Sequence, residues 1–203
     1  MAAEEHKEPL GRLLSEFPES LATNQTFIDD LQSFATVLNV RKGEVLLHTG
    51  ELCSCAYFIN KGLLVNLFIT EKGNECVTSF SSDIQYPFLS DISYVTHKSS
   101  GFEIRALEES ELIRLSKSHI EVLSQRYPDF MLYYIHVLQL LIAKHQTLFA
   151  ILQSYTAEEF IQYIYSCHPW IINRVPDKYI AHYMHISTSW FCKLKKRVVK
   201  SKS

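Results

Sequence analysis

The spacing of apolar side chains changes twice along the chain, and each change divides it. Over residues 26–38 apolar residues recur every three or four positions, which predicts a helix capped by Thr26 and Asp29. Over residues 40–116 the spacing becomes two, in short runs separated by turns about every ten residues. Because no helix intervenes to connect parallel strands, we expect an antiparallel sandwich or jelly roll. The expected strands are 45–48, 57–60, 63–69, 76–81, 102–106 and 112–115.

The longest segment with helical spacing, residues 129–155, follows this half. No Gly or Pro interrupts it, and Pro128 stands at a helix start, where its missing N–H costs nothing. At ~1.5 Å per residue such a helix is roughly 40 Å long. Its apolar residues form two stripes, of which one can pack on the chain itself and the other on a second copy. The stripe assigned to a homodimer consists of Met131, Tyr134, Leu138, Leu141, Leu148 and Leu152, and a neighbouring stripe consists of Ile135, Ile142 and Phe149.

The same segment allows two other interpretations. Its periodicity fits an ordinary buried helix as well as a dimer helix. A membrane span is disfavoured because His136, Lys144 and His145 interrupt the apolar run well inside about 20 residues.

Shorter helices are expected on both sides of the long one. Ser116 can cap a helix that reaches residue 125, and Thr156 can form a capping box with Glu159 at the start of a helix that ends near residue 167. Pro176 precedes a helix over 177–184, and Ser187 can cap a last helix over 188–199.

The short turn between the last two helices is typical of a helix-turn-helix. The predicted fold class is therefore α+β, with an N-terminal jelly roll, a long dimerisation helix and an all-α helix-turn-helix without a clear wing. The expected domain boundaries are 1–127, 128–155 and 156–203.

Composition is that of a globular protein. The 203 residues are 47% hydrophobic, which is enough for a packed core in one ordinary domain and a smaller one. Residues 1–25 hold no secretory or transit pattern, so the cytoplasm is the expected location. The five cysteines are scattered, and Cys53 and Cys55 have no second pair beside them. We therefore expect reduced thiols, no metal site and no cofactor.

Positive charge gathers at the C-terminal end. From residue 174 onward there are eight Lys or Arg and one Asp, a net +7; because the whole chain carries −2, the remainder carries −9. This asymmetry indicates an anionic partner, nucleic acid before membrane, because no apolar face accompanies the final charges. A solvated basic tail is the simpler alternative.

Several motifs, in order, resemble the Crp/Fnr family of bacterial transcription regulators. Gly50-Glu51 followed by Tyr57-Phe58-Ile59-Asn60-Lys61-Gly62 is similar to its G-E…Y-x-I-x-x-G signature, and Glu71-Lys72-Gly73 to its hairpin. Residues 102–112, FEIRALEESEL, resemble its A-L-E-D-S-E strand pair. Residues 174–187, RVPDKYIAHYMHIS, resemble the R-x-P-x-K-Y-I-A-S-Y-L-G-I-T of one branch. The resemblance covers about residues 25–200 and implies a cyclic-nucleotide-binding-like domain joined to a helix-turn-helix.

The resemblance weakens where family members hold a cyclic nucleotide. They use a short F-G-E helix and an R-[ST]-A motif whose Arg forms a bidentate pair with phosphate. Here residues 83–90 and Ser99-Ser100-Gly101 take those places, with Lys98 as the nearest cation. We therefore expect that cyclic AMP is not the effector. An unknown small molecule could occupy a pocket lined by Tyr86, Phe88, Ser90, His97 and Ser100, or side chains could fill it.

The DNA-reading helix follows the family more closely. Phe191, Leu194 and Val198 fit its inward face. Lys193 stands where the family usually has Arg and can still reach guanine O6 and N7. Trp190 is expected in the motif's core, with stacking near the DNA backbone as the alternative, and His185 in a left-handed turn. The residues assigned to double-stranded DNA are Lys178, Ser187, Thr188, Ser189, Lys193, Lys196 and Arg197.

Enzymatic function finds no support in the sequence. There is no Gly-rich phosphate loop, nucleophile elbow or zinc-type His pair, and Glu108-Glu109 fits a solvated turn. The remaining alternative is an effector-sensing or protein-interaction module that has lost sequence-specific DNA binding. A gel shift distinguishes the two.

Overall fold

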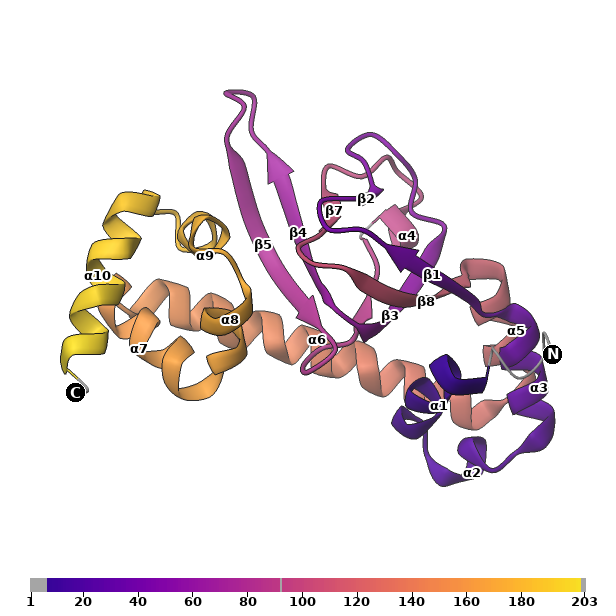
Figure 1. Ribbon diagram of the computed structural model, residues 1–203. Coiled ribbons are helices and arrows are strands. Elements are labelled where there is room, and N and C mark those ends of the chain that lie inside the picture. Colours follow the sequence, from indigo (N-terminus) through magenta and orange to yellow (C-terminus); the bar gives the residue numbers. More distant parts are fainter. Residues whose placement is uncertain (1–6, 92, 202–203) are drawn as a thin grey trace.

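The computed structural model describes residues 7–91 and 93–201 and contains a β domain, a long helix and a C-terminal helical domain (Figure 1). The helices are α1 (Lys7–Glu16), α2 (Glu19–Ala22), α3 (Gln25–Phe34), α4 (Ser93–Thr96), α5 (Lys117–Arg126), α6 (Pro128–Ser154), α7 (Ala157–Cys167), α8 (Pro169–Arg174), α9 (Asp177–Tyr183) and α10 (Thr188–Ser201). The strands are β1 (Thr36–Val40), β2 (Val45–Leu47), β3 (Cys55–Lys61), β4 (Leu63–Ile69), β5 (Glu75–Ser82), β6 (Phe88–Leu89), β7 (Glu103–Ala106) and β8 (Ser110–Ser116).

The strands form two antiparallel sheets, as the jelly-roll prediction requires. One sheet has the order β1-β8-β3-β6 and the other β2-β7-β4-β5. We call the eight strands the β roll. Gly62 links β3 to β4 at φ 120°, and a side chain there would meet Ser110 Oγ at 2.1 Å, so only glycine fits this turn.

Strand β4 is buried on both faces over residues 63–65 and again at Leu67, and apart from Asn66 its residues are apolar. Leu64 faces the interior of the roll, whereas Leu63, Val65 and Leu67 belong to a second core shared with the C-terminal helices. Alternate residues of a strand point to opposite faces, so a strand between two cores carries apolar residues on both faces. The β roll and the C-terminal domain thus share a packed core.

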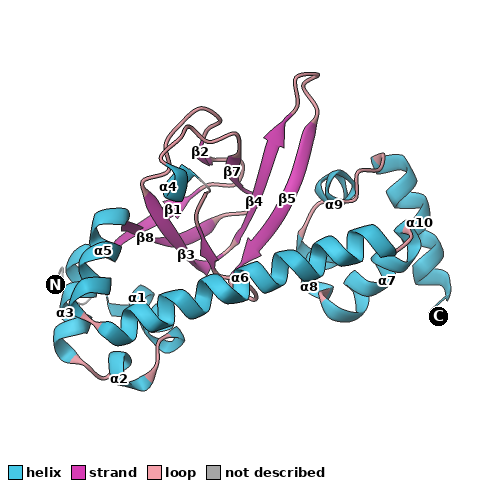
Figure 2. Ribbon diagram, turned by 180° about the vertical axis from the view of Figure 1, so that it is seen from behind, coloured by secondary structure: helices cyan, strands magenta, loops and turns pink. Residues whose placement is uncertain are grey.

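Helix α6 runs along the β roll from the N-terminal helices to the C-terminal ones (Figures 1 and 2). Pro128 occupies its first turn, as predicted, and its last residue is Ser154. The residues that pack on the chain itself, the inward face, are Phe130, Tyr134, Val137, Leu141, Lys144, Leu148 and Ile151. The outward face consists of Met131, Ile135, Leu138, Ile142, His145, Phe149 and Leu152, all exposed.

Both faces repeat at alternating steps of four and three residues, the spacing of a coiled-coil seam. The predicted dimer stripe took residues from each: Tyr134, Leu141 and Leu148 lie on the inward face, partly buried, and are corrected accordingly. Within the described residues, α6 is also the one helix whose length and apolar content would allow a membrane crossing, and most of it is unburied.

Most predicted elements are confirmed within one or two residues, including Ser116 as the cap of α5 and the capping box of Thr156 and Glu159 at α7. The predicted helix over 26–38 is wrong at its C-terminal end. Helix α3 ends at Phe34, and β1 begins at Thr36 and pairs with β8. The β-branched Thr36, Val37 and Val40 favour a strand once β8 offers a partner.

The cap of α3 was also predicted wrongly. The side chain of Asn24, one residue before the helix, accepts a hydrogen bond from the Phe27 amide, in place of a cap by Thr26 and Asp29. Helices α1, α2, α4 and α8 and strands β1 and β6 were not predicted.

Candidate nucleic-acid interface and effector region

Helices α9 and α10 form the predicted helix-turn-helix. The turn contains His185 at φ 54°, the left-handed conformation expected there, and the Ile186 amide donates to the Ala181 carbonyl at 3.0 Å. Ser187 Oγ accepts from the Trp190 amide at 3.2 Å and so caps α10. Phe191, Leu194 and Val198 are buried on the inner face of α10, as predicted.

The outer face of α10 carries Ser189, Trp190, Lys193, Lys196 and Arg197, all exposed, with Thr188 half-buried beside them. The prediction that Trp190 packs in the motif's core is wrong, because its side chain is 43% exposed. The core position is taken by Phe191, one residue further along the helix. Arg197 forms an exposed ion pair with Glu158 at 3.2 Å, a contact worth little in water.

Lys178 does not point freely toward the recognition helix. Its Nζ lies 2.6 Å from Glu75 Oε2 on β5, and Glu75 also pairs with Arg105 at 2.8 Å. Burial raises the pKa of Glu75, but the hydrogen bonds from Lys178 and Arg105 outweigh it and hold that pKa below 4.5. Lys178, assigned to DNA from the sequence, therefore ties α9 to the β roll.

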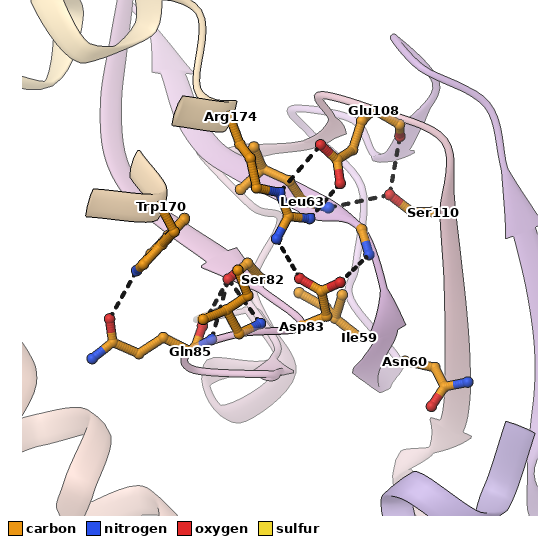
Figure 3. Close-up of polar contacts among 12 residues, drawn as sticks. Ile59, Asn60, Leu63, Ser82, Asp83, Gln85, Glu108, Ser110, Trp170 and Arg174 are labelled. Atoms are coloured by element: carbon orange, nitrogen blue, oxygen red, sulfur yellow. Dashed lines mark hydrogen bonds and ion pairs between the residues drawn. The ribbon is translucent and has the colours of Figure 1, made fainter. Parts of the chain in front are cut away.

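A second polar link ties the C-terminal domain to the roll at Arg174 (Figure 3). Its guanidinium pairs with Asp83 at 2.5 Å and, through two nitrogens, with Glu108. Asp83 in turn accepts from the Gly62 amide at 3.3 Å. The interpretation of Glu108 as a solvated turn residue is therefore wrong, because it anchors a guanidinium from the other domain.

The five residues predicted to line one effector pocket lie apart. Phe88 and Ser90 line a cavity between the β roll and α6, whereas Tyr86 lines a different cavity nearer the C-terminal domain. His97 Nε2 is on the surface, 2.9 Å from Lys117 Nζ. Ser100 is buried, and its hydroxyl is occupied by the backbone of Phe102. The predicted set is therefore not a single site.

The cavity between the roll and α6 is small and apolar. Its volume is ≈ 70 Å³, room for about two water molecules at ~30 Å³ each. Aromatic side chains, including Phe17, Phe58 and Tyr133, line the cavity, and no Lys or Arg is among the described lining residues. Asp91, next to Ser90 in the chain, is buried; its Oδ1 accepts from the Ser93 amide at 2.8 Å, and its Oδ2 has no hydrogen-bond partner among the described residues.

Comparison with known proteins supports the assignment of the β domain. Residues 37–127 match the family model of the cyclic nucleotide-binding domain, a segment that ends just before α6. FixK2 from Bradyrhizobium japonicum superposes with a TM-score of 0.71 at 11% identity, over 83% of this chain and 86% of that one. A protein from Eubacterium rectale described as a Crp/Fnr-family transcriptional regulator superposes at 0.69 and 12% identity, over 89% and 85%.

The chain has the Crp/Fnr fold. A further structure with this fold is the c-di-GMP-responsive global regulator CLP of Xanthomonas campestris, with a TM-score of 0.68 and 12% identity over 88% of this chain and 93% of that one. No curated protein matches the sequence. At these identities the similarity establishes the architecture, while the chemistry of each site rests on this chain's own residues.

The residues around the second cavity were not predicted from the sequence. Gln85 lies in the β5–β6 loop, whereas His168 precedes α8 and Trp170 lies in its first turn; a hydrogen-bond network joins the three residues. Lys144 was treated only as a polar interruption of the long helix, but it lies on the inward face of the Crp/Fnr fold's long helix, against Tyr86. The sequence signal that could have revealed it is a lysine within the apolar stripe that repeats at steps of four and three residues.

Proposed function

We propose that this chain is a transcription regulator of the Crp/Fnr type that binds double-stranded DNA as a homodimer. The observation that carries the proposal is the surface of α10. Its apolar side is buried, while Lys193 and Lys196 are exposed and form no ion pair with any described residue. An exposed basic side of the second helix in such a motif is suited to the DNA major groove. A role on DNA agrees with the cytoplasmic location expected from the sequence.

The outer face of α10 divides into two roles under this proposal. Lys193, with Thr188 and Ser189 near the start of the helix, reads base edges. Ser187, Lys196 and Arg197 hold phosphates and set the orientation. Lys178 keeps at most a secondary phosphate contact, because Glu75 already binds its ammonium group.

The dimer is proposed to form through the outward face of α6. Two recognition helices must lie about 34 Å apart, one turn of DNA, to contact successive major grooves. The outward face presents a seam of exposed apolar residues, with Phe149 66% exposed, and leaving such a seam in water is costly. A second copy of α6 supplies a matching seam. Met131, Leu138 and Leu152 of the original dimer assignment lie on it.

Cyclic AMP is not the proposed effector. The cavity between the roll and α6 offers ≈ 70 Å³ and no guanidinium or ammonium group to a phosphate. A charge-assisted pair is worth ~1.5–3 kcal/mol, so its loss costs roughly ten- to a hundredfold in affinity. Calorimetry with cyclic AMP at micromolar concentration should give no saturation; clear saturation would overturn this part of the proposal.

The test of the proposed function starts with pure protein and a random-sequence duplex library. Repeated selection should enrich a two-fold symmetric site, and gel shifts on that site should weaken linearly in log affinity against log salt. Lys193→Ala should lose the enriched site. Lys195→Ala is the matched control, because Lys195 is bound to Asp177 at 2.7 Å and points off this face. Absence of any shift at low salt would reject DNA binding.

The second candidate is an interaction module that no longer reads DNA. Two observations favour it: Lys178 is engaged by the β roll, and Trp190 is exposed on the reading face, where it would suit a protein surface. The same gel shift decides, since this candidate predicts no binding by parent or variants.

A further inference from the structure

A cavity of ≈ 340 Å³ lies where the β roll, α6 and the C-terminal domain meet. We call it the junction cavity. Its volume is several times that of the cavity between the β roll and α6. Its walls come from the β5–β6 loop, α6, α7, α8 and α9. Six aromatic rings line it: Phe80, Tyr86, Phe160, Tyr163, Trp170 and Tyr183.

Lys144 brings one positive charge into this aromatic enclosure. It is the only Lys or Arg among the described residues that line the cavity. Its Nζ lies 3.7 Å from the centre of the Tyr86 ring and 3.4 Å from the Phe80 carbonyl oxygen, and no carboxylate of a described residue forms an ion pair with it. Tyr86 takes a left-handed backbone conformation, φ 57°, in placing its ring over this ammonium group.

Three further lining residues, Gln85, His168 and Trp170, are joined to one another by hydrogen bonds. Gln85 Oε1 accepts from Trp170 Nε1 at 3.0 Å, and because that nitrogen can only donate, the amide oxygen is fixed as an acceptor. His168 Nδ1, 2.9 Å from the same oxygen, must therefore donate, and the Tyr163 hydroxyl can donate to His168 Nε2 at 3.1 Å. Lys144 is therefore the one Lys or Arg of the described wall, and it lacks a carboxylate partner among the described residues.

We propose that the junction cavity binds a small aromatic carboxylate, with the carboxylate on Lys144 Nζ and the ring among the aromatic walls. Burying an anion beside a desolvated cation satisfies both charges, and offset or edge contacts with several rings favour a flat ligand. The volume holds about eleven waters at ~30 Å³ each, which suits a single-ring acid. A cyclic nucleotide would find no guanidinium group for its phosphate among the described residues of these walls.

Occupancy of this cavity also bears on the relation between the two domains. Its walls belong to the β roll on one side and to the C-terminal helices on the other, so a ligand contacts both. A ligand shifts the domains only as far as it binds one arrangement better than another. The inference goes beyond the proposed DNA binding, and ligand binding is measured on DNA-free protein, so either can fail without the other.

The experiment uses the tryptophan in the cavity wall as the reporter. The chain has two tryptophans, Trp170 and Trp190, so Trp190→Phe leaves Trp170 as the only one. This variant is titrated with 3-phenylpropionate while Trp170 emission is recorded, with 3-phenylpropionamide as the neutral control and hexanoate as the non-aromatic one. Saturation by the aromatic acid, and affinity at least about tenfold weaker for both controls, is expected.

Lys144→Met tests the charge with little change of shape. Its affinity for 3-phenylpropionate should fall about ten- to a hundredfold, to the level of the amide. A pH series on the parent needs no substitution. Burial lowers the pKa of Lys144 to about 8, so affinity should be greatest below pH 8 and fall about tenfold per unit above it, while amide binding stays constant.

The tyrosines and histidines near Lys144 do not change protonation around pH 8. Burial raises the pKa of the surrounding tyrosines, and burial together with the Lys144 charge lowers the pKa of both histidines below 6.5. These groups are Tyr86, Tyr163, Tyr183, His145 and His168. Equal affinity for acid and amide, a flat pH series, or no saturation by 3-phenylpropionate at about 1 mM would each overturn the proposal.

Discussion

The inward and outward faces of α6 have the same spacing and similar composition but opposite surroundings. Each repeats at steps of four and three, and each carries one basic or titratable interruption, Lys144 inward and His145 outward. The inward face contacts two hydrophobic cores, whereas the residues of the outward face are exposed, although Leu138, Phe149 and Leu152 also line cavities. Periodicity therefore reveals that a helix has two apolar faces, while the topology of its own chain decides which face remains for a partner.

Neighbouring substitutions on α6 should separate the two faces most sharply. Leu141→Glu places a carboxylate on the inward face and should destabilise the protein by at least about 3 kcal/mol. Ile142→Glu, one residue on, should leave the helical signal intact while producing monomers and removing DNA binding. Circular dichroism melts and sedimentation measure both. If the two variants behave alike, the assignment of faces is wrong.

Substitutions on α10 should change DNA affinity in two different ways. Lys193→Ala should weaken binding to the cognate site by about 1–3 kcal/mol and leave random DNA nearly unchanged. Lys196→Ala should weaken both and lower the salt slope by about one unit. Fluorescence anisotropy across a salt series measures these effects. Identical losses on cognate and random DNA for Lys193→Ala would remove its role in reading bases.

The packing of the C-terminal domain on the β roll also depends on the ion pairs of Arg174. Its side chain is 21% exposed, and Arg174→Ala would leave Asp83 and Glu108 without their shared cation, at a cost of about 1–3 kcal/mol in urea unfolding. Arg197→Ala is the control, because its pair with Glu158 is exposed and should contribute about 0–1 kcal/mol. If Arg197→Ala lowers the free energy of unfolding as much as Arg174→Ala does, the Arg174 link is not the stronger of the two contacts.

Acid should lower the stability of the protein by a smaller amount, because it weakens the ion pairs of Glu75 with Lys178 and Arg105. Because the folded pKa of Glu75 lies below 4.5, its ion pairs contribute stability that is fully present above pH 4.5 and is lost as pH falls through the folded pKa. Glu75→Gln should remove this part of the pH dependence. Urea midpoints measured from pH 6 to pH 3 for parent and variant check it; parallel curves would exclude the contribution.

The sequence was most informative where local signals were strong. The capping box at Thr156, the proline before α6 and the buried triplet Phe191, Leu194 and Val198 all reflect local geometry and were predicted correctly. The strand at Thr36 was missed because its pairing with β8 is more than seventy residues away. Long-range pairing overrides helical spacing of a few apolar residues.

The candidate sites were harder to predict for the same reason. Lys144, Gln85 and Trp170 meet only because the C-terminal domain packs against β4 and β5, which no local pattern encodes. Lys178 is a residue type suited to a phosphate contact, yet its ammonium group pairs with Glu75 on β5. Trp190 was expected in the core beside Phe191, but the register of α10 buries Phe191 and leaves Trp190 exposed.

The most direct test of the account is the mass of the unmodified protein in solution, because the outward face of α6 is proposed to pair with a second copy. Sedimentation equilibrium at micromolar concentration should give twice the chain mass of 23.5 kDa, and Ile142→Glu should return it to 23.5 kDa. A parent protein that sediments as a monomer of 23.5 kDa at tens of micromolar would contradict the proposal that this face is a dimer interface.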